Sequence, residues 1–513
     1  MMNSNYLLKC VLVSFILAPP FIMISQDGSK TNKFGGISSE TQDQVSLNIM
    51  ELGRSNNLTM QHLDILTNRI GGRLSGSDAY NNAVIWISGL LESWGLDVEL
   101  QEAGSVPVGF NRGPWFGKMI VDSIMHLDFV TPSYTSGTRG SQQGHVVIEP
   151  RSYEEYKKIE GKLKGAWVLI EGRSFGDPID YSSAADKHRR ALIECEDTAK
   201  IANEPALFYK EMRDAGILGI IQSAPTPLVA IYDKKNMMEM TFDSLPKTPD
   251  IKLNESQYKL IRDKVENDEL VILEFDIRNY FKPGPVVFHN VIAQIKGTEY
   301  PDEYVLSGCH LDSYDVASGA IDCGSGVAPN LEMARLIMAA GGDMPKRTIL
   351  FCFWGAEEYG LLGSLRWLEE NEDKWGSISN YFNRDGGPTA ASGLKVPENW
   401  YEDIKRCTEG LEEYHPRIRF TVEKSNASPS MPAFVGNSDH SYFGMFGIPT
   451  ISFENTDPLD YDFDYGEVWH TNKDLFNKSI SEYMEYTSVI QAVTIFNIAN
   501  LDHLLPRSQI YIE

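Results

Sequence analysis

The last part of the chain alternates apolar strand-like runs with loops and helices, and this alternation constrains the fold more than any other feature. Thr348–Trp354 is a strongly apolar run, which is typical of a strand buried on both faces. His289–Ile295, Tyr304–Gly308 and Thr450–Phe453 are further predicted strands, and Ser325–Ala340 has the spacing of an amphipathic helix. The pattern predicts an α/β fold, a mixed central sheet with helices on both faces.

Changes in the pattern of predicted strands and helices along the chain predict how it divides into domains. Residues 123–275 contain short strand-like runs separated by turns, among them His145–Ile148 and Gly165–Ile170, and offer no cluster of histidines and carboxylates. We predict that this segment is a β-rich inserted domain. Residues 26–122 and 276–513 then form the two parts of the main domain.

The first 25 residues have the features of an export signal. Lys9 is the only charged residue before an apolar run from Val11 to Ser25, which is short and interrupted by prolines. Residues 1–25 are therefore predicted to be a signal peptide of a secreted or periplasmic protein, with an uncleaved anchor as the alternative. No other segment of the sequence is long and apolar enough to suggest a membrane span.

Charge and cysteine content argue against several classes of protein. The formal net charge is −25, which disfavours nucleic acid or an anionic membrane as a partner, because both require basic patches. Outside the predicted signal the five cysteines are odd in number and form no CxxC pair, so no disulfide framework is implied. Cys309 and Cys352 lie in apolar runs and are predicted to be buried thiols.

Six ionisable residues in the last third of the chain follow predicted strands or begin turns, where α/β sheets collect their ligands. They are His310, Asp322, Glu357, Glu358, Asp385 and His470. Zinc binds imidazole nitrogen and carboxylate oxygen, and two ions that share a carboxylate need about five protein ligands. The set therefore predicts two zinc ions and one residue left over to act on water.

Each of these motifs could also serve a purely structural purpose. Asp312 lies two residues from His310 and can support it or its surroundings, yet a lone histidine at a strand end is more often structural. Asp322 could simply cap a helix, and Glu357 with Glu358 could be an acidic helix start. However, adjacent carboxylates directly after a buried strand are costly unless a positive charge lies nearby. The joint occurrence of the motifs favours a metal site.

The local sequences and their order resemble the co-catalytic zinc aminopeptidase family, which includes bacterial leucyl aminopeptidases, glutamate carboxypeptidase II and carboxypeptidase Q. The matching pieces are GGRLSGS at 71–77, HLDS at 310–313, GAIDCGSG at 319–326, GAEEYGLLGS at 355–364, RDGG at 384–387 and WHTNKD at 469–474. They cover most of the chain and are closest to the carboxypeptidase Q branch. The resemblance implies a zinc exopeptidase (phosphorylase/hydrolase-like) fold with an inserted protease-associated domain at 123–275.

The resemblance also implies how the ligands divide between two ions. One ion would be held by His310, Asp322 and Asp385. The other would be held by Asp322, Glu358 and His470, with Asp322 as the bridge.

Three further roles follow from the resemblance. Glu357 would be the general base, and Asp312 would support His310. His440, in the segment SDHSYF, would contact the substrate, and a purely structural role for His440 is equally open.

One residue departs from the family pattern. The residue after the bridging carboxylate is usually Asp, Asn or Pro in the family, and here it is Cys323. That peptide bond is often cis in relatives, so we predict a cis bond between Asp322 and Cys323. A thiolate near zinc could change metal preference or sensitivity to oxidation.

The resulting prediction is a secreted dizinc exopeptidase, an aminopeptidase or dipeptidase whose partner is a peptide with a free N-terminus. Glu357 would take a proton from metal-activated water. A glutaminyl cyclase with a similar fold and one zinc is an alternative that metal stoichiometry separates. A receptor-like homologue without catalysis predicts missing ligands or a missing base, whereas all six residues are present. A homodimer is left open.

Overall fold

The computed structural model describes residues 39–120, 124–195, 198–425 and 435–508. The predicted signal peptide, residues 1–25, lies outside these ranges. Within them, no helix has the length and apolar character needed to cross a membrane. The described residues form one compact unit.

The described chain alternates strands and helices over most of its length. The strands are β1 (Asp97–Ile120), β2 (Ile124–His126), β3 (Phe129–Val130), β4 (Gln142–Ile148), β5 (Trp167–Arg173), β6 (Gly219–Ala224), β7 (Asp250–Asn254), β8 (Ile272–Ile295), β9 (Tyr300–His310), β10 (Arg347–Trp354), β11 (Ile378–Asn383), β12 (Ala390–Val396), β13 (Thr421–Lys424) and β14 (Glu454–Thr456). The helices are α1 (Ser39–Ser55), α2 (Thr59–Asp64), α3 (Asp78–Ser93), α4 (Tyr153–Ile159), α5 (Ser183–Cys195), α6 (Thr198–Asn203), α7 (Tyr209–Asp214), α8 (Lys234–Glu239), α9 (Glu255–Glu266), α10 (Gly324–Ala339), α11 (Leu362–Glu370), α12 (Tyr401–Cys407), α13 (His440–Met445), α14 (Tyr465–Val468) and α15 (Ser481–Ala499).

The centre of the fold is a mixed sheet in which the strand order is β11-β9-β10-β8. Strands β9, β10 and β11 are parallel, whereas β8 is antiparallel to β10 and to β1. Every residue of β10 is buried, as expected for an apolar strand with neighbours on both sides and helices on both faces. The predicted mixed α/β sheet is thereby confirmed.

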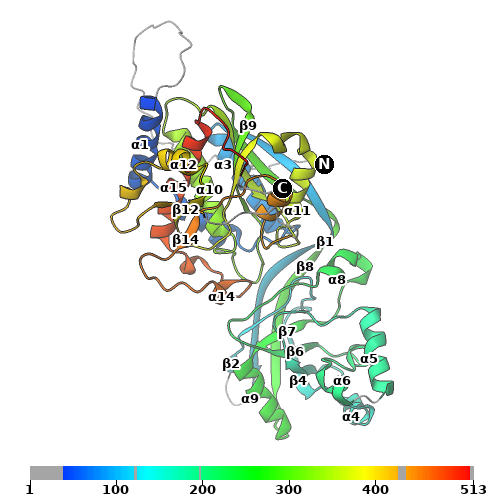
Figure 1. Ribbon diagram of the computed structural model, residues 1–513. Coiled ribbons are helices and arrows are strands. Elements are labelled where there is room, and N and C mark those ends of the chain that lie inside the picture. The colour runs from blue at the N-terminus through cyan, green and yellow to red at the C-terminus, as the bar shows by residue number, and fades with distance from the viewer. Residues whose placement is uncertain (1–38, 121–123, 196–197, 426–434, 509–513) are drawn as a thin grey trace, which may run out of the picture. The chain divides into compact units, whose positions relative to one another are not determined.

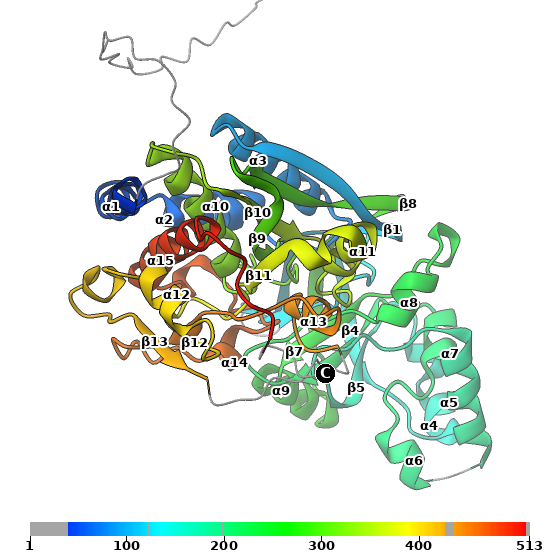
Figure 2. The ribbon, with the colours of Figure 1, turned by 45° about the horizontal axis from the view of Figure 1, so that its top comes forward.

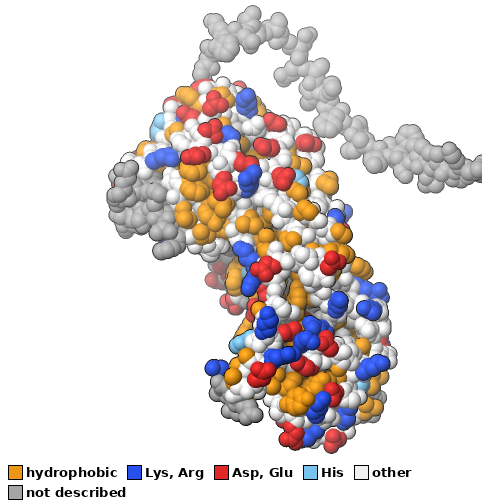
Figure 3. All heavy atoms as spheres, turned by 90° about the vertical axis from the view of Figure 1, so that its right-hand side faces the viewer, with side chains coloured by type: hydrophobic (Ala, Val, Ile, Leu, Met, Phe, Trp, Pro, Cys, Tyr) orange, Lys and Arg blue, Asp and Glu red, His pale blue; other side chains and the backbone are white. Residues whose placement is uncertain are grey.

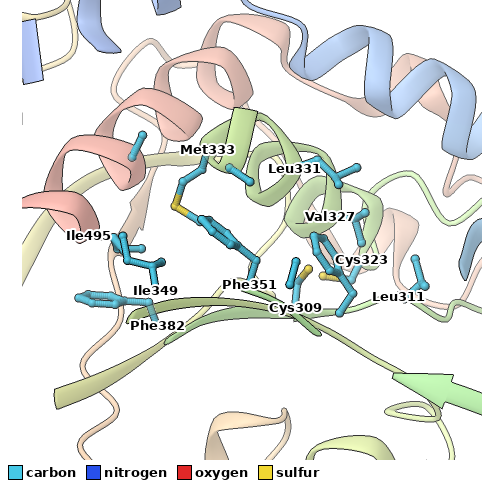
Figure 4. Packing of buried hydrophobic residues seen from close by; sticks show 14 of the residues in the cluster. Cys309, Leu311, Cys323, Val327, Leu331, Met333, Ile349, Phe351, Phe382 and Ile495 are labelled. Atoms are coloured by element: carbon cyan, nitrogen blue, oxygen red, sulfur yellow. The ribbon is translucent and has the colours of Figure 1, made fainter. Parts of the chain in front are cut away.

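The alternation of side chains along β10 divides the core into two layers; Figure 2 shows the helices, and Figure 4 shows part of one layer. Ile349, Phe351 and Phe353 belong to the cluster that contains residues of α3, α10 and α15. The residues between them, Leu350 and Cys352, pack in a second cluster with residues of α11 and α13. Successive side chains of a strand point to opposite faces, so this strand joins both layers of helices.

Strands β1 and β8 are unusually long and pair antiparallel from Asp97 with Gln294 to Ile120 with Ile272 (Figure 1). Beyond the central strands, β8 also pairs with β4, and the sheet continues in the order β4-β5-β6-β7-β3. The strand runs predicted at His145–Ile148 and Gly165–Ile170 lie largely in β4 and β5.

Residues 124–275 alternate strands β4 to β7 with helices α4 to α9, so this segment is α/β and not simply β-rich. This segment has two hydrophobic clusters of its own, one on each side of the sheet. Trp167 of β5 belongs to one cluster, and its neighbour Val168 belongs to the other. A separate protease-associated domain with bounds at 123 and 275 stays a prediction.

One predicted strand is absent from the structure. The run Thr450–Phe453 does not form a β-strand, and the short strand β14 begins only at Glu454. The side chain of Asn380 instead bonds both the carbonyl and the N–H of Ile451, at 3.0 and 2.9 Å. The apolar run therefore lies beside β11 without extending the sheet, because a side chain satisfies its backbone.

Charges on the surface are mixed. Figure 3 shows acidic and basic side chains interspersed among apolar ones on one face of the molecule. Exposed ion pairs such as Lys259 with Asp263, at 2.8 Å, contribute little to stability individually.

Candidate metal centre

The six predicted site residues lie at one edge of the central sheet, His310 at a strand end and the other five on loops. His310 is the last residue of β9, Glu357 and Glu358 follow β10, and Asp385 follows β11. These strands are parallel neighbours, so their carboxyl ends meet at the same edge. The loop before α10 adds Asp322, and the loop after α14 adds His470. The expected cis peptide bond between Asp322 and Cys323 is confirmed.

Asp322 lies between the two histidines. Its Oδ1 is 3.1 Å from Nε2 of His310, and its Oδ2 is 3.4 Å from Nε2 of His470. His310 Nε2 is also 3.5 Å from Oδ1 of Asp385, and His470 Nε2 is 3.2 Å from Oε2 of Glu358. Two groups of ligand atoms thus share one carboxylate, with a different oxygen in each group.

The chemistry of this set fits zinc. The side chains of Asp322, Asp385 and Glu358 are all at least largely buried, and Oε1 of Glu358 has no hydrogen-bond partner in the structure. Buried carboxylates this close together are unfavourable without a compensating cation. Neutral imidazole nitrogen and carboxylate oxygen are ligands that zinc prefers, and a shared carboxylate is a feature of two-metal sites.

Glu357 differs from its neighbour Glu358 in its surroundings. Within the described part of the chain, Glu357 forms no ion pair with either site histidine, whereas Glu358 pairs with His470. Burial raises the pKa of Glu357, and the nearby Asp439 carboxylate adds to this effect while His310 opposes it. Glu357 is therefore a carboxylate held beside the ligand groups and not among them.

Asp312 connects the loops after β9 and β10. Its carboxylate oxygens accept hydrogen bonds from the backbone N–H groups of Glu357 and Glu358, at 3.2 and 3.3 Å. Its backbone oxygen lies 3.0 Å from Nδ1 of His310, and its carboxylate Oδ1 lies at 3.6 Å. Asp312 thus contacts His310 chiefly through its backbone and uses its carboxylate to hold the turn that carries the two glutamates.

Asp474, whose role the sequence did not reveal, holds the loop of Asp322. Its two carboxylate oxygens accept from the N–H groups of Ile321 and Asp322, at 2.6 and 3.2 Å. Burial, with a contribution from Asp322, raises the pKa of Asp474 to about 7. Its place in the run WHTNKD was the only signal that could have identified it.

Residues of the GGRLSGS motif at 71–77 also form hydrogen bonds that hold the loops of the site. The buried Arg73 guanidinium donates to the carbonyls of Leu311 and Gly319, at 2.8 and 3.0 Å. The hydroxyl oxygen of Ser75 accepts from the N–H of Ala356 at 2.8 Å. Residues distant in sequence thereby fix the loops that carry His310, Asp322 and the two glutamates.

The segment between β6 and α8 also reaches the site, which the sequence did not predict. The hydroxyl of Tyr232 donates to the backbone oxygen of Glu358. The N–H of Ala230 donates to the backbone oxygen of His470 at 3.4 Å. The ring of Tyr314 lies 4.0 Å from the His470 ring between centroids and 5.7 Å from the Tyr232 ring. Tyr314 therefore packs against His470, and Tyr232 holds the backbone of Glu358.

His440, the predicted substrate contact, lies near Asp385 at the start of α13. Its Nδ1 is 3.4 Å from the amide nitrogen of Asn383. Burial lowers the pKa of His440, and Asp385 opposes that shift. This position at the border of the ligand groups suits either a substrate contact or a structural role.

Comparisons with known proteins agree with this site. Residues 290–493 match peptidase family M28, and this span contains all six site residues. Carboxypeptidase Q from Homo sapiens is 22% identical over 463 residues, 90% of this chain and 89% of that protein. The Bos taurus protein is 24% identical over the same shares of each chain.

Solved structures show the same fold. A peptidase M28 precursor from Shewanella amazonensis has a TM-score of 0.57 at 22% identity, covering 91% of this chain and 99% of that one. The zinc aminopeptidase BSAP from Bacillus subtilis has a TM-score of 0.50 at 17% identity, covering 88% and 97%. Taken with the paired ligand groups, these matches support a zinc metallopeptidase with two zinc ions as cofactor: residues 290–493 match peptidase family M28, and 90% of the chain is similar to carboxypeptidase Q.

Proposed function

We propose that this protein is an exported aminopeptidase or dipeptidase that hydrolyses peptide bonds next to a free N-terminus. The observation that carries the proposal is the position of Asp322, whose two oxygens face two different histidines. Such an arrangement suits a pair of ions that act together on one bond. Export rests on the sequence of residues 1–25, and a protease-associated domain at 123–275 rests on the family resemblance.

The ligands divide between the ions as the distances suggest. One ion takes His310, Asp322 and Asp385, and the other takes Asp322, Glu358 and His470. The unpartnered Oε1 of Glu358 supports the second group, because a buried carboxylate oxygen without a hydrogen bond needs a cation. When bound, the two ions polarise the scissile carbonyl and lower the pKa of water.

Glu357 is the proton carrier in this mechanism. Its carboxylate accepts a proton from the attacking water and delivers it to the nitrogen of the leaving amine. Asp312 sets the direction of Glu357 by accepting its backbone N–H at 3.2 Å. Tyr232 and Tyr314, which pack against the ligand loops, help to keep bulk water from His470.

The two alternatives have less support. A glutaminyl cyclase with one zinc would have no use for a second histidine paired with a buried carboxylate, yet His470 and Glu358 are 3.2 Å apart. A receptor-like protein without catalysis would have no need of a base, yet Glu357 is held in place by Asp312.

The test is a panel of di-, tri- and tetrapeptides with free and blocked termini, combined with elemental analysis for zinc. We expect two zinc ions per chain, hydrolysis that requires a free N-terminus, and loss of activity when a chelator removes the zinc. An aminopeptidase cleaves all three lengths, whereas a dipeptidase cleaves only the dipeptide with both termini free. Equal cleavage of N-terminally blocked peptides, or one zinc with cyclisation of N-terminal glutamine, contradicts the proposal.

A further inference from the structure

The departure from the family pattern, Cys323, places a sulfur atom within one of the ligand groups. The Cys323 side chain is fully buried, and its thiol is free. Its Sγ, a ring nitrogen of His310 and a carboxylate oxygen of Asp385 all lie within 4.8 Å of one another. That spacing can close around a single ion with a small adjustment of side chains.

A glycine lies against the sulfur of Cys323. A Cβ atom at Gly326 would come within 2.6 Å of Cys323 Sγ and 2.9 Å of Cys309 Cβ. Figure 4 shows the sulfur atoms of Cys323 and Cys309 facing the space between α10 and the sheet. The glycine at 326 therefore keeps open the space that the Cys323 sulfur occupies.

The number of donors at this position gives the sulfur a role. Nε2 of His310 already has Asp322 at 3.1 Å and Asp385 at 3.5 Å, which makes three ligands with the histidine itself. Thiolate sulfur is a donor that zinc also accepts, and here it is grouped with His310 and Asp385 and not with Asp322. Among the described residues, the other candidate metal group, His310 with Asp322 and Glu358, contains no sulfur.

We propose, on the basis of the proposed dizinc function, that Cys323 is a further ligand of the ion held by His310 and Asp385. The two ions would then be unequal, because only the ion at His310 would have a sulfur ligand. In the structure the Cys323 thiol donates to the backbone oxygen of Arg384 at 3.2 Å. When the ion binds, the S–H bond breaks, the proton passes to water and the sulfur lone pair forms the bond to the metal.

This assignment predicts different behaviour of the two ions. Sulfur favours soft metals over hard ones, so the His310 ion is retained longer than the His470 ion against a chelator. Cadmium binding should depend on Cys323 more strongly than zinc binding does. Loss of the sulfur should lower cadmium affinity at least about tenfold, the lower end of what removal of an outer-shell partner costs.

The experiment loads the unaltered full chain with cobalt(II) in the presence of a reductant that does not bind metal. A bond between sulfur and cobalt gives a near-ultraviolet charge-transfer band that nitrogen and oxygen ligands do not give. We expect this band in the wild type, its loss in Cys323→Ser, and its retention in Cys309→Ala, the control that removes the neighbouring buried thiol. Chelation should release one ion faster than the other in the wild type and both together in Cys323→Ser.

The outcomes separate this proposal from the function on which it rests. Two bound cobalt ions without the near-ultraviolet band in the wild type overturn the role of Cys323 and leave the dizinc enzyme intact. Fewer than two bound ions contradict both. A band that survives in Cys323→Ser assigns the sulfur to another cysteine and also overturns the proposal. The absence of the band in the wild type overturns the proposal by itself, so the proposal can fail even if the variant does not fold.

Discussion

Glu357 and Glu358 are neighbours in sequence, yet the structure gives them different surroundings. Glu358 pairs with His470 at 3.2 Å and has a buried oxygen without a hydrogen bond. Glu357 is held by Asp312 through its backbone and has no histidine partner among the residues that the structure describes. These surroundings suit the separate tasks proposed for the two residues, Glu358 as a ligand and Glu357 as the base.

The pair of variants Glu357→Gln and Glu358→Gln tests this division. Glutamine keeps the size of glutamate but cannot accept the proton, so Glu357→Gln should retain about two zinc ions and lose turnover by roughly 10²–10⁴-fold. Glu358→Gln should lose zinc, because a neutral amide is a much poorer ligand. Zinc content and dipeptide hydrolysis are measured together. Metal loss in the first variant with full metal in the second reverses the two roles.

The candidate ligands were easier to recognise in the sequence than the residues that support them. His310, Asp322 and His470 were recognisable because histidines and carboxylates in ordered motifs at strand ends are typical of metal sites. Asp474 and Arg73 act through backbone groups of distant loops, and such contacts leave no periodicity or spacing in the sequence. Supporting contacts of this kind become visible only when the chain is folded.

At the scale of elements, the loop between β6 and α8 links residues 124–275 to the metal centre. Ala230 and Leu228 form backbone hydrogen bonds with the loop of His470, and Tyr232 bonds the backbone of Glu358. This loop therefore positions two ligands that belong to other parts of the chain.

Tyr232→Phe removes the hydroxyl and leaves a ring that can still pack against Tyr314 and Tyr359. We expect an intact fold and a zinc affinity lowered roughly tenfold, since partners behind ligands typically matter by 10–100-fold. Zinc release to a chelator is the measurement, with circular dichroism as a check on folding. The matched control is Tyr258→Phe, which loses a hydroxyl bond to the backbone oxygen of Ile170 at 2.7 Å, within the same segment. Equal zinc affinity in both variants contradicts a positioning role.

Helices and strands were predicted correctly where the apolar periodicity was strong. One strand was predicted wrongly, where a side chain and not a neighbouring strand bonds the backbone. The helix predicted over Ser325–Ala340 differs by one residue at each end from α10, and the run Thr348–Trp354 lies within β10. The run Thr450–Phe453 has a similar apolar pattern but is bonded by the side chain of Asn380. Apolar patterning reports burial, and it does not report which partner satisfies the backbone.

At the scale of the whole molecule, a buried carboxylate remote from the metal centre makes stability depend on pH. Glu149 accepts backbone N–H groups of Glu171 and Leu207 and pairs with Arg151. Burial nevertheless raises its pKa from 4.5 to about 7. Between these two values the folded chain keeps a proton that the unfolded chain has released, so the free energy of unfolding falls as pH rises through this window.

Glu149→Gln removes that titration. We expect the difference in Tm between variant and wild type to shift in favour of the variant as pH rises from about 5 to 8. Calorimetry across this range is the measurement, and the exposed Glu239→Gln controls for the removal of a carboxylate. A Tm difference for Glu149→Gln that does not change with pH, or that shifts toward the wild type, contradicts the prediction.

The long pairing of β1 with β8 has a practical consequence. A break anywhere between Ile120 and Ile272 would leave two fragments, each carrying one strand of a ladder that runs from Asp97 with Gln294 to Ile120 with Ile272. The second fragment would contain every proposed zinc ligand. The first would contain Arg73 and Ser75, which form hydrogen bonds with the loops that carry those ligands. The protein is thus suited to reconstitution from two separately produced halves, with recovery of zinc binding as the signal that they have reassembled.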